Sequence, residues 1–190
     1  RLYDRPIVAL LSHFLIRSWD EVDSGQPGYY SPDKILNGEF DEDFRTWARG
    51  GVACGKPLLY SFAPGPTDPS RPWHGAYNGG EQIGPTRYRD AWEHVEEILK
   101  QEGFYKVATP VYGATLPRHP LEDPEWPEVN PLRQDASYYR QGANVGFVFV
   151  NGVYGLLPQH GYQTWFSFLD QLRPVVDYVD SFAPEKKLFI

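Results

Sequence analysis

Short apolar runs alternate with amphipathic helical stripes along this chain, and the alternation constrains the fold more than any other feature. The apolar runs span residues 6–14, 57–63, 105–112, 145–150 and 187–190. Runs this short that are apolar on both faces are typical of buried parallel strands. Strands that alternate with helices favour an α/β fold with a parallel sheet, so about five strands are expected here.

Helical stripes fill the connections between the expected strands. Phe40, Phe44 and Trp47 recur at helical spacing, with Asp41 as the predicted N-cap and Gly55 as the stop. Further stripes cover residues 88–99, 135–140 and 165–179. The helix over residues 88–99 is expected to follow a loop that runs to Pro85, to begin at a Thr86 cap and to end at Gly103. In the last helix, Pro174 is expected to cause a kink or a restart.

The loops are unequal in length. Connections after the expected helices are short, whereas those after the expected strands are long and rich in aromatic residues. In α/β barrels the loops after strands build the functional face. A closed barrel of eight strands needs about 250 residues. The 190 residues therefore predict a single domain, residues 1–190, that forms part of a (β/α)8 TIM barrel.

Charge and composition exclude several classes of partner. Eighteen basic and 25 acidic residues give a formal charge of −7, which argues against nucleic acid and anionic membranes. No apolar run approaches the ~20 residues of a membrane-spanning helix. The chain lacks Met and ends in an apolar run at Ile190, so a longer natural protein is expected. The lone Cys54 excludes an internal disulfide and is expected to be a small buried group.

The polar motifs give no metal centre. The five histidines have no metal-ligand spacing, and no metal or organic cofactor is expected. His94 lies beside acidic residues on a helix and is predicted to be solvated. His13, near a strand end, is either a ligand contact or a hydrogen-bonded core histidine.

Aromatic residues in the loops after strands are the main functional signal. Flat rings with polar tips suit the C–H faces and hydroxyl edges of sugars, and packing within the loops is the equal alternative. The residues concerned are Trp19, Tyr29, Tyr30, Trp73, Tyr77, Trp126, Tyr154 and Tyr162.

Several stretches, taken in order, resemble the family 26 glycoside hydrolases, the β-mannanase group. The main ones are residues 56–64 (KPLLYSFAP), 72–80 (PWHGAYNGG) and 88–95 (YRDAWEHV), with weaker agreement at residues 35–41, 144–154 and 165–190. The resemblance implies an eight-stranded (β/α) barrel that hydrolyses β-linked polysaccharide with retention, in a secreted protein. It favours β-mannan as substrate, with mixed-linkage glucan or xylan as alternatives. Matching positions give a sugar platform at Trp73, Tyr77 and Tyr154, with Trp165 and His13 as further contacts.

The resemblance also implies that the catalytic pair is missing. Retaining hydrolysis needs two carboxylates about 5–5.5 Å apart. Gly65 stands where the family has its acid/base glutamate, and the nucleophile would fall beyond Ile190. Asp68, Glu81 and Asp20 are the candidate substitutes among the acids in the loops after strands, and each is predicted to be a solvated loop charge.

Four interpretations follow. The chain is an incomplete, inactive hydrolase, a non-catalytic glycan-binding relative, an α/β scaffold without a sugar role, or a working hydrolase in which a frameshift, splicing or other artefact altered residues 65–71.

Overall fold

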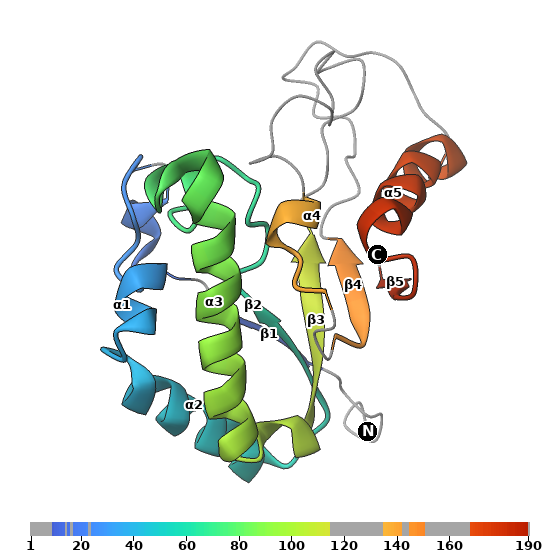
Figure 1. The fold of residues 1–190 in the computed structure, drawn as a ribbon. Coiled ribbons are helices and arrows are strands. Elements are labelled where there is room, and N and C mark those ends of the chain that lie inside the picture. Colours follow the sequence, from blue (N-terminus) through green and yellow to red (C-terminus); the bar gives the residue numbers. More distant parts are fainter. Residues whose placement is uncertain are drawn as a thin grey trace.

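The computed structural model describes residues 9–13, 15, 17–22, 24–114, 135–141, 145–150 and 168–189. Five parallel strands form one sheet in the order β1-β2-β3-β4-β5 (Figure 1). Their bounds are β1 (Ala9–His13), β2 (Leu58–Phe62), β3 (Ala108–Ala114), β4 (Phe147–Val150) and β5 (Lys187–Phe189). The predicted α/β class and parallel pairing are confirmed. The sheet is open, because β1 and β5 each pair with one neighbour and not with each other.

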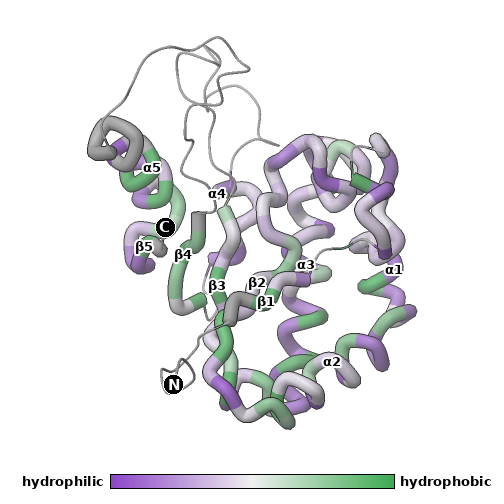
Figure 2. Tube along the Cα trace, turned by 180° about the vertical axis from the view of Figure 1, so that it is seen from behind, coloured by the Kyte–Doolittle hydropathy of each residue, from purple (hydrophilic) through white to green (hydrophobic). Residues whose placement is uncertain are grey.

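Helices follow the strands as the apolar stripes predict. They are α1 (Pro32–Leu36), α2 (Asp41–Cys54), α3 (Gly80–Gln101), α4 (Asp135–Tyr138) and α5 (Phe168–Phe182), with short 3-10 turns η1 (Trp19–Glu21), η2 (Gly75–Tyr77) and η3 (Phe104–Lys106). Figures 1 and 2 view the sheet from opposite sides, and α2 and α3 lie against the side seen in Figure 1.

The register decides which strand residues face these helices. Leu11 pairs with Tyr60 and Tyr60 pairs with Pro110, so these residues share one face of the sheet. The Tyr60 ring contacts Trp47 of α2, which identifies this face as the helix side. On the opposite face Thr109 is exposed.

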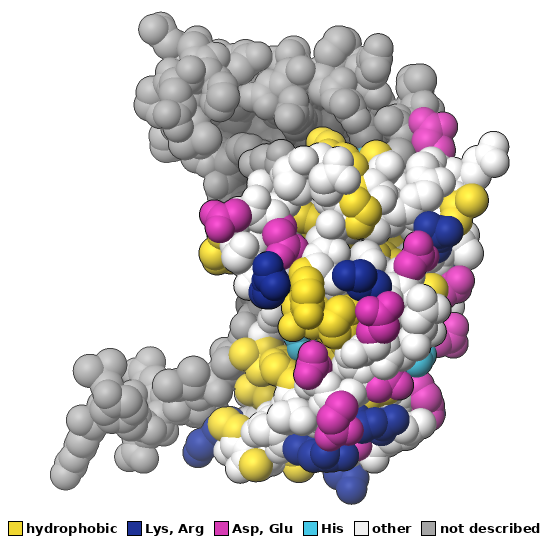
Figure 3. Space-filling model, turned by 90° about the vertical axis from the view of Figure 1, so that its left-hand side faces the viewer, with side chains coloured by type: hydrophobic (Ala, Val, Ile, Leu, Met, Phe, Trp, Pro, Cys, Tyr) yellow, Lys and Arg dark blue, Asp and Glu magenta, His cyan; other side chains and the backbone are white. Residues whose placement is uncertain are grey.

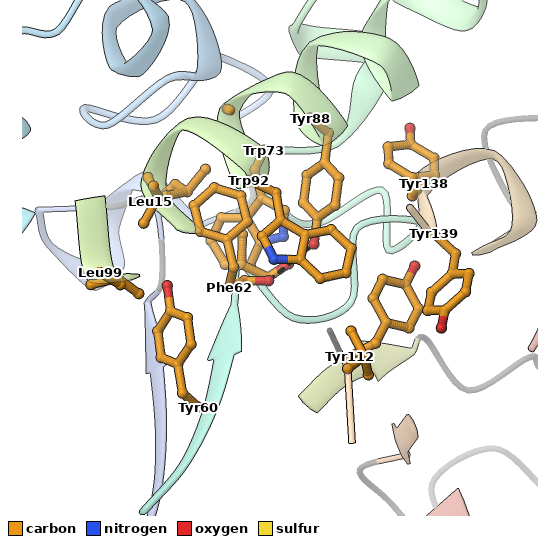
Figure 4. Close-up of a cluster of buried hydrophobic side chains, with 14 of the residues drawn as sticks. Leu15, Tyr60, Phe62, Trp73, Tyr88, Trp92, Leu99, Tyr112, Tyr138 and Tyr139 are labelled. Carbon is orange, nitrogen blue, oxygen red and sulfur yellow. Dashed lines mark hydrogen bonds between the residues drawn. The ribbon is translucent and has the colours of Figure 1, made fainter. Parts of the chain in front are cut away.

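Aromatic side chains form a large part of the core between the sheet and its helices. Tyr112 of β3 stacks on Trp92 of α3 with ring centroids 5.8 Å apart and an angle of 23°. Phe62 of β2 contacts Tyr88 at 5.6 Å (Figure 4). Burying one large side chain of this kind stabilises the fold by about 2 kcal/mol. These contacts fix α3 across the middle of the sheet.

Charged pairs join the helices at the surface. Figure 3 shows cationic and anionic side chains interspersed on one side of the molecule. Arg49 of α2 lies 2.8 Å from Glu102 after α3, and Arg87 of α3 lies 2.9 Å from Asp33 of α1. His94 was predicted to be solvated, but it is half-buried and its Nε2 atom lies 2.7 Å from a carboxylate oxygen of Asp41.

Helix boundaries differ from the expectation at two N-termini. Phe40, not Asp41, is the N-cap of α2, although Gly55 ends this helix in the predicted left-handed conformation with φ 63°. Helix α3 begins at Gly80, so the expected loop to Pro85 and the Thr86 cap are wrong. Tertiary packing explains the earlier start, because Gly84 lies directly against Gly75 of η2.

Two further expectations concern α2 and α5. Cys54 ends α2 as an exposed residue rather than a buried one. Helix α5 runs through Pro174 as one element.

Candidate functional site

The carboxyl end of β2 turns sharply at residues 62–65, here called the β2 turn. Ala63 has φ 37° and Gly65 has φ 68°, so two of its residues adopt left-handed backbone. For a residue with a side chain this conformation is strained, and it persists only where surrounding contacts fix it.

Four hydrogen bonds fix the β2 turn. The hydroxyl of Tyr88 lies 3.0 Å from the carbonyl oxygens of both Phe62 and Ala63. The amide of Ala63 donates to the carbonyl of His13 on β1 at 2.7 Å, and the amide of Gly65 donates to the carbonyl of Gly113 on β3 at 2.8 Å. The turn is therefore anchored to β1, β3 and α3 at once.

Gly113 has a second role in this arrangement. A Cβ atom built on Gly113 would lie 2.4 Å from Cβ of Pro64, a separation that real atoms do not adopt. Only a glycine on β3 therefore lets the β2 turn pass this close. Ser61 of β2 lies just before the turn, and its side chain is wholly buried.

Gly65 is the residue for which the sequence resemblance implies the acid/base position. Its left-handed backbone is a conformation that glycine adopts without cost and that glutamate does not. The glycine therefore fits the backbone geometry of the turn, and it offers no side chain to transfer a proton.

The loop after the β2 turn is tied together by its own side chains. The Asp68 carboxylate accepts a hydrogen bond from the amide of Ser70 at 2.9 Å and one from the guanidinium of Arg71 at 3.1 Å. Asp68 therefore holds the loop and is not a solvated charge, which corrects the expectation for this residue. Glu81 and Asp20 are exposed, as predicted.

Trp73 lies inside this loop and is 1% exposed. The guanidinium carbon of Arg71 lies 5.8 Å from its ring. The ring is thus enclosed by the chain, and a sugar would reach it only after the covering groups move.

Tyr77 remains partly exposed at the surface of the same loop. Its hydroxyl donates to the carbonyl of Pro69 at 2.7 Å, which orients the ring. Of the described sugar contacts expected from the resemblance, Trp73 is buried, whereas Tyr77 and His13 are each partly exposed. Tyr154 and Trp165 lie outside the described residues.

His13 lies on the helix side of β1. Its Nδ1 atom is 3.0 Å from the hydroxyl of Tyr60, and its ring centroid lies 4.1 Å from that of Trp47. Burial lowers the pKa of His13 to about 3, although part of the residue is accessible at the surface. These contacts favour the core alternative over direct contact with a ligand.

Two aromatic side chains after β1 are more exposed than any expected contact among the described residues. Trp19 is 67% exposed and Tyr29 is 39% exposed. The Tyr29 ring has Arg17 at 5.0 Å and Lys34 at 5.1 Å, and its amide donates to Glu21 at 2.7 Å. Sequence position identified both as loop aromatics, but exposure depends on contacts that position alone does not define.

Comparison with models of known protein families and with curated proteins gives no match for this sequence. Within the described ranges, no group of three or more His, Cys, Asp or Glu side chains is arranged to hold a metal ion. In the same parts of the chain, no helix has both the length and the apolarity needed to cross a membrane.

Proposed function

We propose that this chain is part of a (β/α)8 barrel of the family 26 glycoside hydrolase type, and that it binds β-linked polysaccharide without cleaving it. The strand order supports the proposal, because all five parallel strands follow one another in sequence. Successive right-handed strand–helix units wound in one direction are the arrangement from which barrels are built. A doubly wound sheet would instead reverse its strand order at one point.

The proposal that the chain does not cleave its ligand depends on one observation, the left-handed backbone of Gly65 in the β2 turn. A retaining hydrolase needs an acid/base carboxylate, and loss of a general acid typically costs 10²–10⁴ in rate. Asp68, three residues further on, is already paired with Arg71. The turn thus keeps a defined shape at the place where the proton donor is missing.

The exposed rings of Trp19 and Tyr29, together with Tyr77, are the proposed sugar contacts among the described residues. Indole and phenol rings offer apolar faces to the C–H groups of a pyranose, and their polar tips bond hydroxyl groups. By the resemblance, Tyr154 and Trp165 would add to this platform. The favoured ligand is β-mannan, followed by mixed-linkage glucan and xylan, and the proposed location is extracellular.

Isothermal titration with manno-oligosaccharides, in parallel with an assay for reducing ends, tests this proposal. Saturable binding without release of reducing ends is the expected result. Release of reducing ends that depends on this chain would overturn the non-catalytic assignment. Absence of binding to mannan, mixed-linkage glucan and xylan oligosaccharides would favour a scaffold without a sugar role.

A pair of variants locates the binding surface. Trp19→Ala removes the most exposed of the described aromatic rings, and Ile83→Ala removes an apolar side chain of α3 that is 49% exposed. Weaker binding is expected for the first variant alone. Equal affinity in both variants would remove Trp19 from the proposed platform.

A further inference from the structure

Tyr88 of α3 is buried, and its hydroxyl lies at the β2 turn. The side chain is 1% exposed, packs against Phe62 and reaches past it to the end of β2 (Figure 4). The two carbonyl oxygens at 3.0 Å belong to consecutive residues, one of which is the strained Ala63.

The ladder between β2 and β3 explains why these carbonyls need another donor. The paired residues run from Leu58 with Ala108 to Tyr60 with Pro110 and go no further. Phe62 therefore lies beyond the pairing with β3, although it still pairs with His13 of β1. A buried carbonyl without a donor is costly, so the phenol of Tyr88 takes the place of a strand amide.

The state of the phenol suits this role. Burial, followed by the nearby negative charge of Asp135, raises the pKa of Tyr88 well above its usual value. The hydroxyl thus keeps its proton at neutral pH and remains a hydrogen-bond donor. A phenol carries one proton, which the two carbonyl oxygens share.

We infer that Tyr88 is a positioning residue for the glycan site, because its hydroxyl fixes the β2 turn and thereby the loop that carries Tyr77. Tyr88 acts through the backbone and touches no sugar. The inference rests on the proposed function for its link to binding, whereas its effect on the turn stands independently.

Tyr88→Phe is the test, because it removes the hydroxyl and keeps the ring in the core. Tyr112→Phe is the matched control. It also deletes a buried hydroxyl beside α3, but that hydroxyl bonds Asp135 at 2.6 Å and not the β2 turn. Both variants are expected to lose some global stability.

Residue-resolved amide hydrogen exchange separates local from global effects. In Tyr88→Phe the amides of Ala63 and Gly65 are expected to lose protection by about tenfold relative to those of α2. In Tyr112→Phe the protection of these two amides relative to α2 is expected to stay unchanged. Equal relative protection in both variants would overturn the inference.

The second readout is affinity for manno-oligosaccharides. Tyr88→Phe is expected to raise the dissociation constant by about tenfold, the effect of one lost positioning hydrogen bond, while Tyr112→Phe leaves it unchanged. Selective loss of protection with unaltered affinity would overturn the link to binding. If the unmodified protein binds no glycan, the proposed function fails, and the exchange experiment still decides whether Tyr88 fixes the turn.

Discussion

The hydroxyl of Tyr112 on β3 donates to the carboxylate of Asp135 at 2.6 Å, and neither side chain has appreciable solvent exposure. Tyr178 of α5 donates to the second carboxylate oxygen at 2.7 Å. One buried acid thus joins a strand and two helices. Burial first, and then the charge of Asp135, raise the pKa of Tyr112 well above its usual value.

Replacement of Asp135 by alanine is therefore expected to be strongly destabilising. The change leaves the hydroxyls of Tyr112 and Tyr178 without this acceptor, and loss of such a buried network costs about 2–4 kcal/mol. Urea denaturation measures the change in the free energy of unfolding. The exposed Asp90→Ala on α3 is the control and should alter this free energy by less than about 0.5 kcal/mol. A comparable value for Asp135→Ala would contradict the structural role.

Acid is expected to destabilise the fold through His13. Its pKa is about 3 in the folded chain against 6.5 for an ordinary histidine. The unfolded state therefore binds the proton more tightly, and stability falls as pH drops from about 6.5 toward 3. Allowing for the partial exposure of the residue, the loss is on the order of 2 kcal/mol between pH 7 and pH 4.

Denaturation series at several pH values test this dependence. The variant His13→Asn should have a flatter profile between pH 4 and pH 7, whereas His94→Asn should retain the contribution of His13. An unchanged profile in His13→Asn would show that another group causes the acid sensitivity.

Gly65→Glu places a carboxyl group at the position where the proposed function expects an acid/base residue. The left-handed φ of 68° makes a side chain unfavourable there, and the expected loss of stability is about 1–2 kcal/mol. Hydrolysis is not expected, because the strained turn does not hold the new side chain in a productive geometry. Gly65→Asn, which tolerates left-handed backbone better, should cost less. Release of reducing ends by Gly65→Glu would refute this expectation.

Two helical glycines should respond to alanine in opposite directions. A Cβ atom on Gly84 of α3 would lie 2.4 Å from Cα of Gly75, so overpacking is expected to cost about 1–3 kcal/mol. Gly50 of α2 has open space at this position, and alanine is expected to stabilise the helix by about 0.5–1 kcal/mol. Thermal unfolding of the two variants provides the comparison, and a shift of the same sign in both would count against the close contact of α3 with η2.

The sequence allowed prediction of all five strands because each is a short apolar run between turn residues. The third was expected to start at Tyr105, but η3 occupies residues 104–106 and β3 starts at Ala108. Gly55 also ended α2 as expected, since a left-handed C-cap is a local property of glycine. The start of α3 was predicted wrongly because it depends on a tertiary contact and not on local sequence. Gly80, Gly84 and Pro85 oppose a helix locally, and contact between Gly84 and Gly75 overrides that preference.

Prediction of the site was less complete. Sequence position placed Trp73 in a loop after a strand, but the enclosure of its ring depends on contacts such as that with Arg71. The roles of Tyr88 and Asp135 join segments far apart in the chain, and no local pattern distinguishes these residues from others on the same helices. Expectations for Tyr154 and Trp165 stay predictions.

Each described strand pairs only with the strands next to it in the chain, so the sheet can be assembled in the order of synthesis. Each pairing joins strands separated by one connection, which is the smallest loop that a parallel pair can close. Each new strand–helix unit adds to an edge that already exists and leaves earlier contacts undisturbed. During evolution, such a molecule can gain or lose whole units at its edges while the interior ones keep their geometry.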